Sequence, residues 1–154
     1  HSFPTRRSSD LSSNPEILRK SKRKSVEHLR EYELIEYCYR LGIKINAFYI
    51  FGLIPDTRES ILDTIEYAKS LKTFSSQFTI NTPLPGTGFY NDMSQQINQD
   101  ISLEEYDNNT LVFSHDNLSA EELYSLKEKA FLEYYFSPKL IFRYLRWKIK
   151  DLFL

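Results

Sequence analysis

The sequence predicts an α/β fold in which helices alternate with the strands of a parallel sheet. Helix, strand, helix and strand patterns follow one another between residues 27 and 82. The first strand pattern is apolar almost throughout, which is typical of strands that a parallel sheet buries on both faces. The chain has 154 residues, 41% of them hydrophobic and 27% charged, enough for the core of about one domain. Consecutive parallel strands are joined by right-handed crossovers, so helices are expected to cover the sheet.

The first helix is expected over residues 27–41 and the first strand over residues 44–53. Gly42 stands between them and provides a helix stop signal. The strand segment, KINAFYIFGL, is rich in β-branched and aromatic residues, which favour extended structure. The apolar stripe of the helix recurs at helical spacing and consists of Leu34, Ile35, Cys38 and Leu41.

A second helix and a second strand follow. Asp56 is expected to cap the helix. The strand, residues 78–82, is ended by PLPGTG, residues 83–88, whose prolines and glycines continue neither a ladder nor a helix. Ligands of parallel α/β sheets lie beyond the carboxyl ends of the strands, so function is expected at residues 51–56 and 81–87. The apolar stripe of the second helix consists of Ile61, Ile65, Ala68 and Leu71.

Residues 92–154 are expected to form a helical C-terminal region. A short helical segment is predicted from Leu103. Ser119 and Glu122 make a capping-box pair, flanked by leucines at the two positions of a hydrophobic staple. Pro138 interrupts the helical pattern and is expected to open the last helix, because proline is favoured in a first helical turn.

The first eleven residues differ in character from the rest of the chain. Residues 1–11, HSFPTRRSSDL, have no apolar period and no helix cap. Read back through the genetic code, they resemble a sequencing-library adapter translated in frame. Such processing scars are set aside in fold reasoning. We therefore expect residues 1–11 to be disordered and without function; a disordered basic tail is the alternative interpretation.

Charge and cysteine content exclude several classes of function. The net charge of −1 gives no reason to expect nucleic acid or an anionic membrane as a partner. The single cysteine, Cys38, excludes an internal disulfide framework and any cysteine-only metal site within the chain, and it favours a reducing compartment, the cytoplasm. His28 and His115 stand apart from other ligand residues in the sequence, so no metal site is predicted.

Two strand-end segments carry motifs of a known enzyme family. They are IFGLIPDT, residues 50–57, and TPLPGT, residues 82–87, which occur in that order with a helix between them. Together they resemble the later strands of radical S-adenosylmethionine (SAM) enzymes, in the subgroup that often carries a cobalamin-binding domain. The resemblance covers residues 12–91. It implies the C-terminal part of a partial (β/α)6 TIM-like barrel, followed by the α-helical C-terminal region.

The resemblance also implies cofactors that this chain cannot hold alone. Enzymes of the family bind a [4Fe-4S] cluster through a CxxxCxxC motif, cleave SAM to a 5'-deoxyadenosyl radical and in some cases use cobalamin. Thiolates are the ligands of such clusters, and the CxxxCxxC motif is absent here. The chain is therefore expected to be an inactive fragment. Its complete parent would act on an unidentified organic substrate, by methylation, methylthiolation or cyclisation, and the missing N-terminal half would be its partner.

The site residues implied by the resemblance bind the cofactor SAM; none is catalytic. They are Ser12, Arg23, Phe51, Gly52, Leu53, Pro83 and Leu84. Alternatives stay open for the groups. Pro83 and Leu84 present backbone groups to adenine or are simply part of a proline-rich turn. Phe51, Gly52 and Leu53 are either a wall for adenosine or a buried strand end that needs glycine for close packing. Arg23 pairs with the SAM carboxylate or is a solvated charge. Ile54 and Pro55 stand where the family usually has Pro-Gly, so the turn lacks a glycine that permits positive φ.

Other interpretations are open for the C-terminal segment and for the function of the whole chain. The basic, aromatic tail IFRYLRWKIKDLFL is expected to pack against the barrel, with contact of this helix with a membrane surface as the less favoured alternative. For the whole chain, the alternative is a non-catalytic helical module that binds a partner and is attached to a partial α/β sheet. Another βα-barrel enzyme is a third interpretation, because a fold alone does not determine chemistry.

Overall fold

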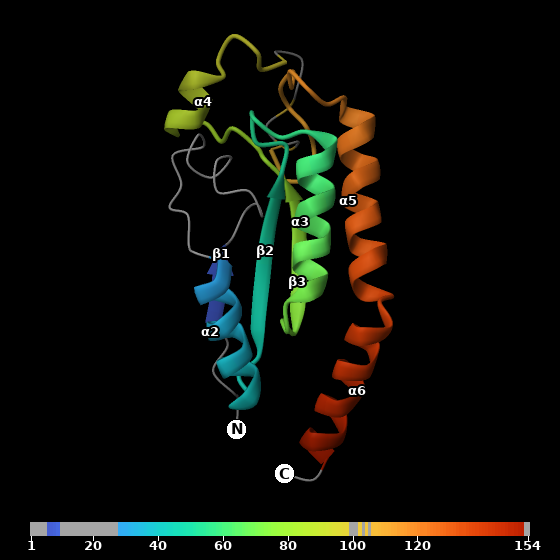
Figure 1. Cartoon of the computed structure of the whole chain (residues 1–154). Helices are drawn as coiled ribbons and strands as arrows, with labels where there is room; N and C mark the ends of the chain where they lie inside the picture. The colour runs from blue at the N-terminus through green and yellow to red at the C-terminus, as the bar shows by residue number, and fades with distance from the viewer. Residues whose placement is uncertain (1–5, 10–27, 99–101, 103, 105, 153–154) are drawn as a thin grey trace.

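The computed structural model describes residues 6–9, 28–98, 102, 104 and 106–152. These residues form a mixed α/β fold whose strands are parallel, as expected (Figure 1). The sheet has the order β1-β2-β3 and is open, so its closure into a barrel stays a prediction. The strands are β1 (Arg6–Ser9), β2 (Ile45–Phe51) and β3 (Ser75–Ile80); the helices are α2 (His28–Arg40), α3 (Arg58–Ser70), α4 (Gly88–Asp92), α5 (Ala120–Tyr135) and α6 (Pro138–Leu152).

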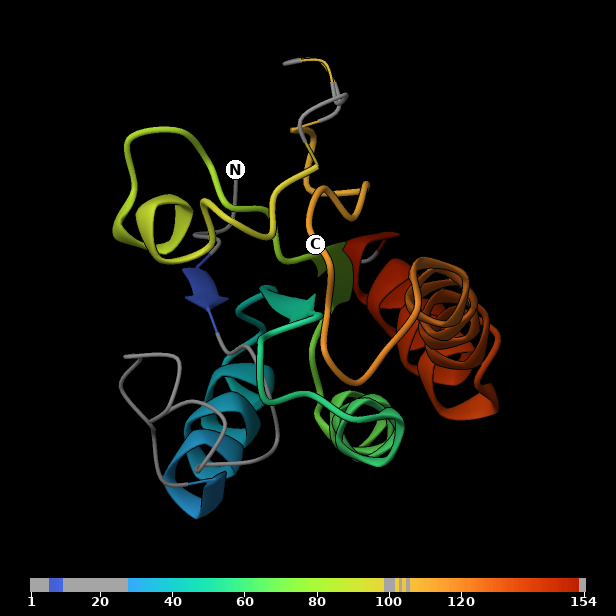
Figure 2. The same ribbon diagram turned by 90° about the horizontal axis from the view of Figure 1, so that it is seen from above.

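The core lies between the sheet and the helices on one of its sides. Figure 2 shows α2, α3 and α5 in an arc on the same side of the strands. Along β2 burial alternates, so the sheet is buried on one face only, whereas the sequence predicted burial on both. The reason is that the described helices cover one face, and alternate side chains of a strand point to opposite faces. The covered β2 residues are Ile45, Ala47, Tyr49 and Phe51.

Strand β1 differs from the expectation for residues 1–11. Its four residues pair in parallel with β2, from Arg6 opposite Ile45 to Ser9 opposite Phe48. The edge of β2 presents backbone N–H and C=O groups, and pairing with them requires no particular side-chain pattern. A segment without strand-like sequence can therefore occupy this edge. The origin of residues 1–11 stays a prediction.

Helix α2 ends as predicted but packs through a narrower face. Gly42 has φ 77°, and the N–H of Ile43 returns to the carbonyl of Cys38 at 2.9 Å, which closes the helix end. Ile35 and Cys38 are buried with Ile45 and Leu71. The two outer members of the predicted stripe, Leu34 and Leu41, are exposed by 48% and 57%.

Helix α3 has the predicted apolar stripe and a different cap. Its four stripe residues are all buried. The N-cap is Thr57, whose side chain accepts from the Ser60 N–H while the Ser60 side chain accepts from the Thr57 N–H. Asp56, the predicted cap, precedes this box and uses its carboxylate in the turn before the helix.

The C-terminal helices complete the core. The capping box of Ser119 and Glu122 is confirmed, and the staple residues Leu118 and Leu123 are both buried in the main cluster. Pro138 opens α6 as predicted. Helix α5 packs on α3 and β3, so the helical region shares one core with the α/β part. Helix α4 was not predicted. Of the helical segment expected from Leu103, residues 103 and 105 lie outside the described residues, and residues 106–109 form turns where a helix was expected.

No helix in the described part of the chain is both long and apolar enough to cross a membrane.

Candidate functional site at the carboxyl ends of two strands

Two loops meet at the carboxyl edge of the sheet: loop A, residues 52–56 after β2, and loop B, residues 81–87 after β3. The backbone N–H of Asn81 donates to the carbonyl of Phe51 at 2.8 Å, and the Asn81 side-chain amide donates to the carbonyl of Gly52 at 3.4 Å. Asn81 is itself buried. The expectation that these segments lie together is confirmed, and Asn81 is the residue that joins them.

Asp56 holds loop A in its turn. Its N–H donates to the carbonyl of Leu53 at 2.7 Å, and its carboxylate accepts from the N–H of Leu53 at 2.9 Å. The carboxylate also accepts from the hydroxyl of Ser60 at 3.1 Å. Asp56 is only 2% exposed, and this burial raises its pKa to about 6, against the opposing effect of the hydrogen bonds. Neither Ile54 nor Pro55 has positive φ, so this turn closes without the glycine that the family usually has there.

Residues 115–117, which are distant in sequence, form hydrogen bonds with loop A. Nε2 of His115 lies 2.9 Å from the carbonyl of Leu53, and the N–H of Asn117 donates to Nδ1 of His115 at 3.1 Å. A carbonyl only accepts, so Nε2 carries a proton and Nδ1 is the acceptor. The Asn117 amide also donates to the carbonyl of Asp56 at 3.1 Å. Sequence reasoning missed this role of His115, because 62 positions separate it from Leu53.

Three predicted site residues of loop A and its strand are packed inside the protein. Phe51 is 1% exposed, and its ring lies 5.7 Å from that of Phe78 in the core. Leu53 is 3% exposed, and Gly52 is buried as well. A Cβ on Gly52 would lie 3.3 Å from Cδ1 of Leu123 in α5. These contacts agree with the packing interpretation of the segment; contact with a cofactor stays a prediction.

Loop B offers the more accessible surface. Pro83 is fully buried, whereas the adjacent Leu84 is 41% exposed. The carbonyl of Leu84 accepts from the Thr87 N–H at 3.1 Å and from the Thr87 hydroxyl at 2.7 Å, so the loop is held in a defined turn. The remaining predicted site residues, Ser12 and Arg23, lie outside the described residues.

Gly52 provides a direct test of loop A. We expect Gly52→Ala to lower the free energy of unfolding by about 1–3 kcal/mol, because alanine at φ 79° is strained and its Cβ presses on Leu123. Gly42→Ala is the matched control: it has φ 77° and no heavy atom within 4 Å of the added Cβ. Urea unfolding measures both. Equal losses in the two variants would contradict a packing role for Gly52.

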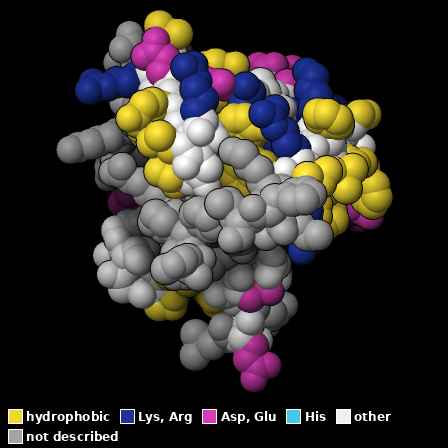
Figure 3. All heavy atoms as spheres, turned by 90° about the horizontal axis from the view of Figure 1, so that it is seen from below, with side chains coloured by type: hydrophobic (Ala, Val, Ile, Leu, Met, Phe, Trp, Pro, Cys, Tyr) yellow, Lys and Arg dark blue, Asp and Glu magenta, His cyan; other side chains and the backbone are white. Residues whose placement is uncertain are grey.

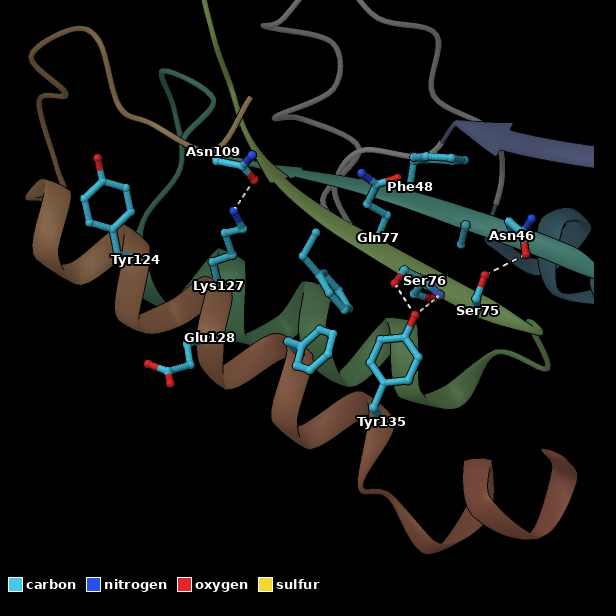
Figure 4. A pocket seen from close by; sticks show the side chains of 13 residues that line it. Asn46, Phe48, Ser75, Ser76, Gln77, Asn109, Tyr124, Lys127, Glu128 and Tyr135 are labelled. Atoms are coloured by element: carbon cyan, nitrogen blue, oxygen red, sulfur yellow. Dashed lines mark hydrogen bonds between the residues drawn. The ribbon is translucent and has the colours of Figure 1, made fainter. Parts of the chain in front are cut away.

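A cavity of about 740 Å³ lies apart from these loops, between the sheet and α5 (Figure 4). Its floor consists of residues 46–48 of β2 and 75–78 of β3, toward the amino-terminal ends of the strands. From α5, the hydroxyl of Tyr135 accepts from the Ser76 N–H at 3.3 Å and donates to the Ser76 carbonyl at 2.8 Å. The cavity thus follows the outer edge of β3, and it contains none of the predicted site residues.

The residues present do not fit an iron-sulfur cluster. Cys38 is buried between α2 and the start of β2, at the opposite end of the strand from loop A. A group of three potential metal ligands is absent from the described part of the chain. For SAM the fit is partial: the buried polar side-chain atoms of loops A and B have hydrogen-bond partners, so the residues available to a ligand are the exposed ones, Ile54 and residues 84–88.

Comparison with known proteins points to methyltransferases. No protein-family model matches the chain. It is similar to an uncharacterized methyltransferase of Pyrococcus horikoshii, with 27% identity over 131 residues, which are 84% of this chain and 27% of that protein. It is also similar to the bacteriochlorophyllide d C-8(2)-methyltransferase of Chlorobaculum tepidum, with 33% identity over 60 residues, 39% of this chain and 13% of that protein. The matched part therefore spans about a quarter or less of these relatives.

Proposed function

We propose that this chain is the C-terminal part of a longer SAM-dependent methyltransferase, and that loops A and B form one wall of its cofactor site. The observation that carries the proposal is the joining of the two motif-bearing loops by Asn81 at the carboxyl edge of a parallel sheet. This edge is where α/β proteins bind ligands. Similarity to two methyltransferases, over 131 and 60 residues, supports the same function.

The two loops have different parts in this proposal. Loop A supplies a rigid support. Its turn is held by the carboxylate of Asp56, which accepts from Ser60 of α3, and by the contact of His115 with the Leu53 carbonyl. In loop B, the exposed side chain of Leu84 offers an apolar surface on which adenine can pack. Thr87 donates to the carbonyl of Leu84 and so fixes the turn that follows it. SAM, when bound, supplies the methyl group.

The finer form of the proposal is a radical SAM enzyme, with a [4Fe-4S] cluster and in some members cobalamin. The motifs of loops A and B support it. The cluster would be held by a part of the parent outside this chain, since Cys38 is buried in an apolar cluster. The chain alone is therefore expected to be inactive, and its partner is the N-terminal part of the same protein.

Binding of SAM to the complete parent tests the coarser proposal. We expect Leu84→Asp to raise the dissociation constant of SAM about tenfold, because it replaces apolar contact area by a charge. The control is Leu34→Asp, an exposed leucine of similar accessibility on α2, and it should leave the dissociation constant unchanged. Equilibrium dialysis with labelled SAM gives both values. A parent that binds no SAM would contradict the proposal and favour the non-catalytic module.

The radical form has a separate readout. After anaerobic reconstitution, the complete parent should show a cluster absorbance that SAM perturbs, and a CxxxCxxC motif should precede the segment that begins at Ser12. A parent that binds SAM but assembles no cluster would contradict the radical form and leave the methyltransferase proposal intact.

A further inference from the structure

Helix α6 contacts the other described residues of the protein through one face. Leu140 and Trp147 are 6% and 8% exposed, and the Trp147 ring stacks on that of Phe74 with centroids 5.1 Å apart. Between them, Nη1 of Arg143 donates to the carbonyl of Leu71 at 2.8 Å, at the end of α3. This face attaches the helix to the α/β part and leaves the other faces of α6 available.

A second apolar stripe lies on the far side of α6. Successive helical residues are rotated by about 100°, so apolar residues three or four apart fall close together, on the side away from Leu140 and Trp147. Their exposed fractions are large for apolar side chains, and such a continuous patch indicates an interaction surface. The stripe consists of Ile141 (46%), Phe142 (71%), Leu145 (54%) and Ile149 (58%).

Basic side chains border this stripe. By the same helical rotation, Lys139 and Arg146 lie on one flank and Lys148 on the other, and all three are exposed. Lys139 and Arg146 form no ion pair with any residue in the described part of the chain. The helix has five lysines and arginines against one aspartate, although the whole chain has a net charge of −1. In Figure 3 hydrophobic and basic side chains lie interspersed on the face seen from below.

We propose that α6 docks this protein on an anionic lipid membrane, with the stripe 141–149 in the interface and the basic flanks at the headgroups. An apolar stripe bordered by lysine and arginine on both sides matches acyl chains below anionic headgroups. A second copy of the chain fits less well, because it would bring the same positive charge to the contact. Helix α6 has 15 residues and lies on the surface of the bilayer without spanning it. This inference goes beyond the proposed methyltransferase function and is independent of it.

Vesicle sedimentation tests the apolar stripe. The chain is expected to bind vesicles of phosphatidylcholine mixed with anionic phosphatidylglycerol, and to bind pure phosphatidylcholine vesicles much more weakly. The double variant Phe142→Glu, Leu145→Glu should lower the partition coefficient at least about tenfold, because two apolar anchors are lost. The matched control is Leu29→Glu, Leu34→Glu, which alters exposed leucines of α2. Circular dichroism melting checks that both variants keep the fold.

Neutralising the flanks tests the electrostatic part. Lys139→Gln with Arg146→Gln should lower the partition coefficient about twenty-five-fold, since each basic residue near an anionic surface contributes on the order of a fivefold change. The control Arg40→Gln with Arg58→Gln removes the same charge from exposed positions outside α6. Added salt should weaken binding of the unmodified chain.

Three outcomes would overturn the proposal. The first is equal binding of the unmodified chain to anionic and neutral vesicles, and the second is an equal loss in the α6 and control variants. The third is a dimer of the unmodified chain in vesicle-free solution. If the double variant Phe142→Glu, Leu145→Glu were monomeric there, the stripe would be assigned to contact with a second copy of the chain.

Discussion

Replacing Tyr134 with alanine is expected to lower the free energy of unfolding by about 3–5 kcal/mol, as for other large aromatic side chains removed from a core. Tyr134 is 1% exposed in α5, and its ring meets that of Phe78 edge to face with centroids 5.9 Å apart. Its hydroxyl lies 2.7 Å from Oγ1 of Thr73, which is also buried. The variant therefore leaves a cavity where α5 packs on β3, and it leaves the Thr73 hydroxyl with only its longer contact, 3.5 Å to Oγ of Ser76.

Two further variants separate the contributions of the ring and the hydroxyl. Tyr134→Phe keeps the ring and should cost about 1 kcal/mol, the usual value of one hydrogen bond. Tyr37→Ala, on the exposed side of α2, should have little effect, because its side chain is 60% exposed. Urea unfolding gives all three values. A loss for Tyr134→Ala no larger than that for Tyr37→Ala would show that α5 does not pack on β3 in this way.

The stability of the chain is expected to fall as the pH rises through about 6, because of Asp56. Burial raises the pKa of this carboxyl from 3.8 to about 6, so the folded state holds a proton that the unfolded state releases. Between these two values the folded state binds more protons, and the free energy of unfolding decreases with pH. The contribution of Asp56 is fully present below about pH 4. Above about pH 6 it is lost, and the shift corresponds to about 3 kcal/mol.

Asp56→Asn should remove this pH dependence while keeping the turn. Its amide oxygen can accept from the N–H of Leu53, and its NH₂ group can donate to Ser60, whose hydroxyl also lies 3.0 Å from the carbonyl of Thr57. The control Asp63→Asn changes an exposed aspartate of α3 and should leave the pH profile as it was. Urea midpoints between about pH 4 and pH 8 measure the effect. An equal fall of the midpoint with pH in the wild type and in Asp56→Asn would contradict the assignment to Asp56.

Local signals in the sequence determined the order of the elements and most of their ends. The helix stop at Gly42, the capping box of Ser119 and Glu122 and the start of α6 at Pro138 each depend on a few neighbouring residues. Backbone φ preferences and cap hydrogen bonds act over one helical turn, so they can be read without knowledge of the fold. Adjacency of loops A and B also followed, because parallel strands end at the same edge of a sheet.

Only the tertiary structure decided which groups are used at each place. Thr57 is the N-cap of α3 in place of Asp56, because the Asp56 carboxylate accepts from the N–H of Leu53 in the preceding turn. His115 reaches Leu53 across 62 positions, and no local pattern indicates such a contact. Strand β2 is buried on one face because the described helices cover only that side, and α6 hides one apolar stripe while it exposes another. Periodicity shows that a face is apolar; what covers that face depends on contacts between distant segments, which only the folded chain brings together.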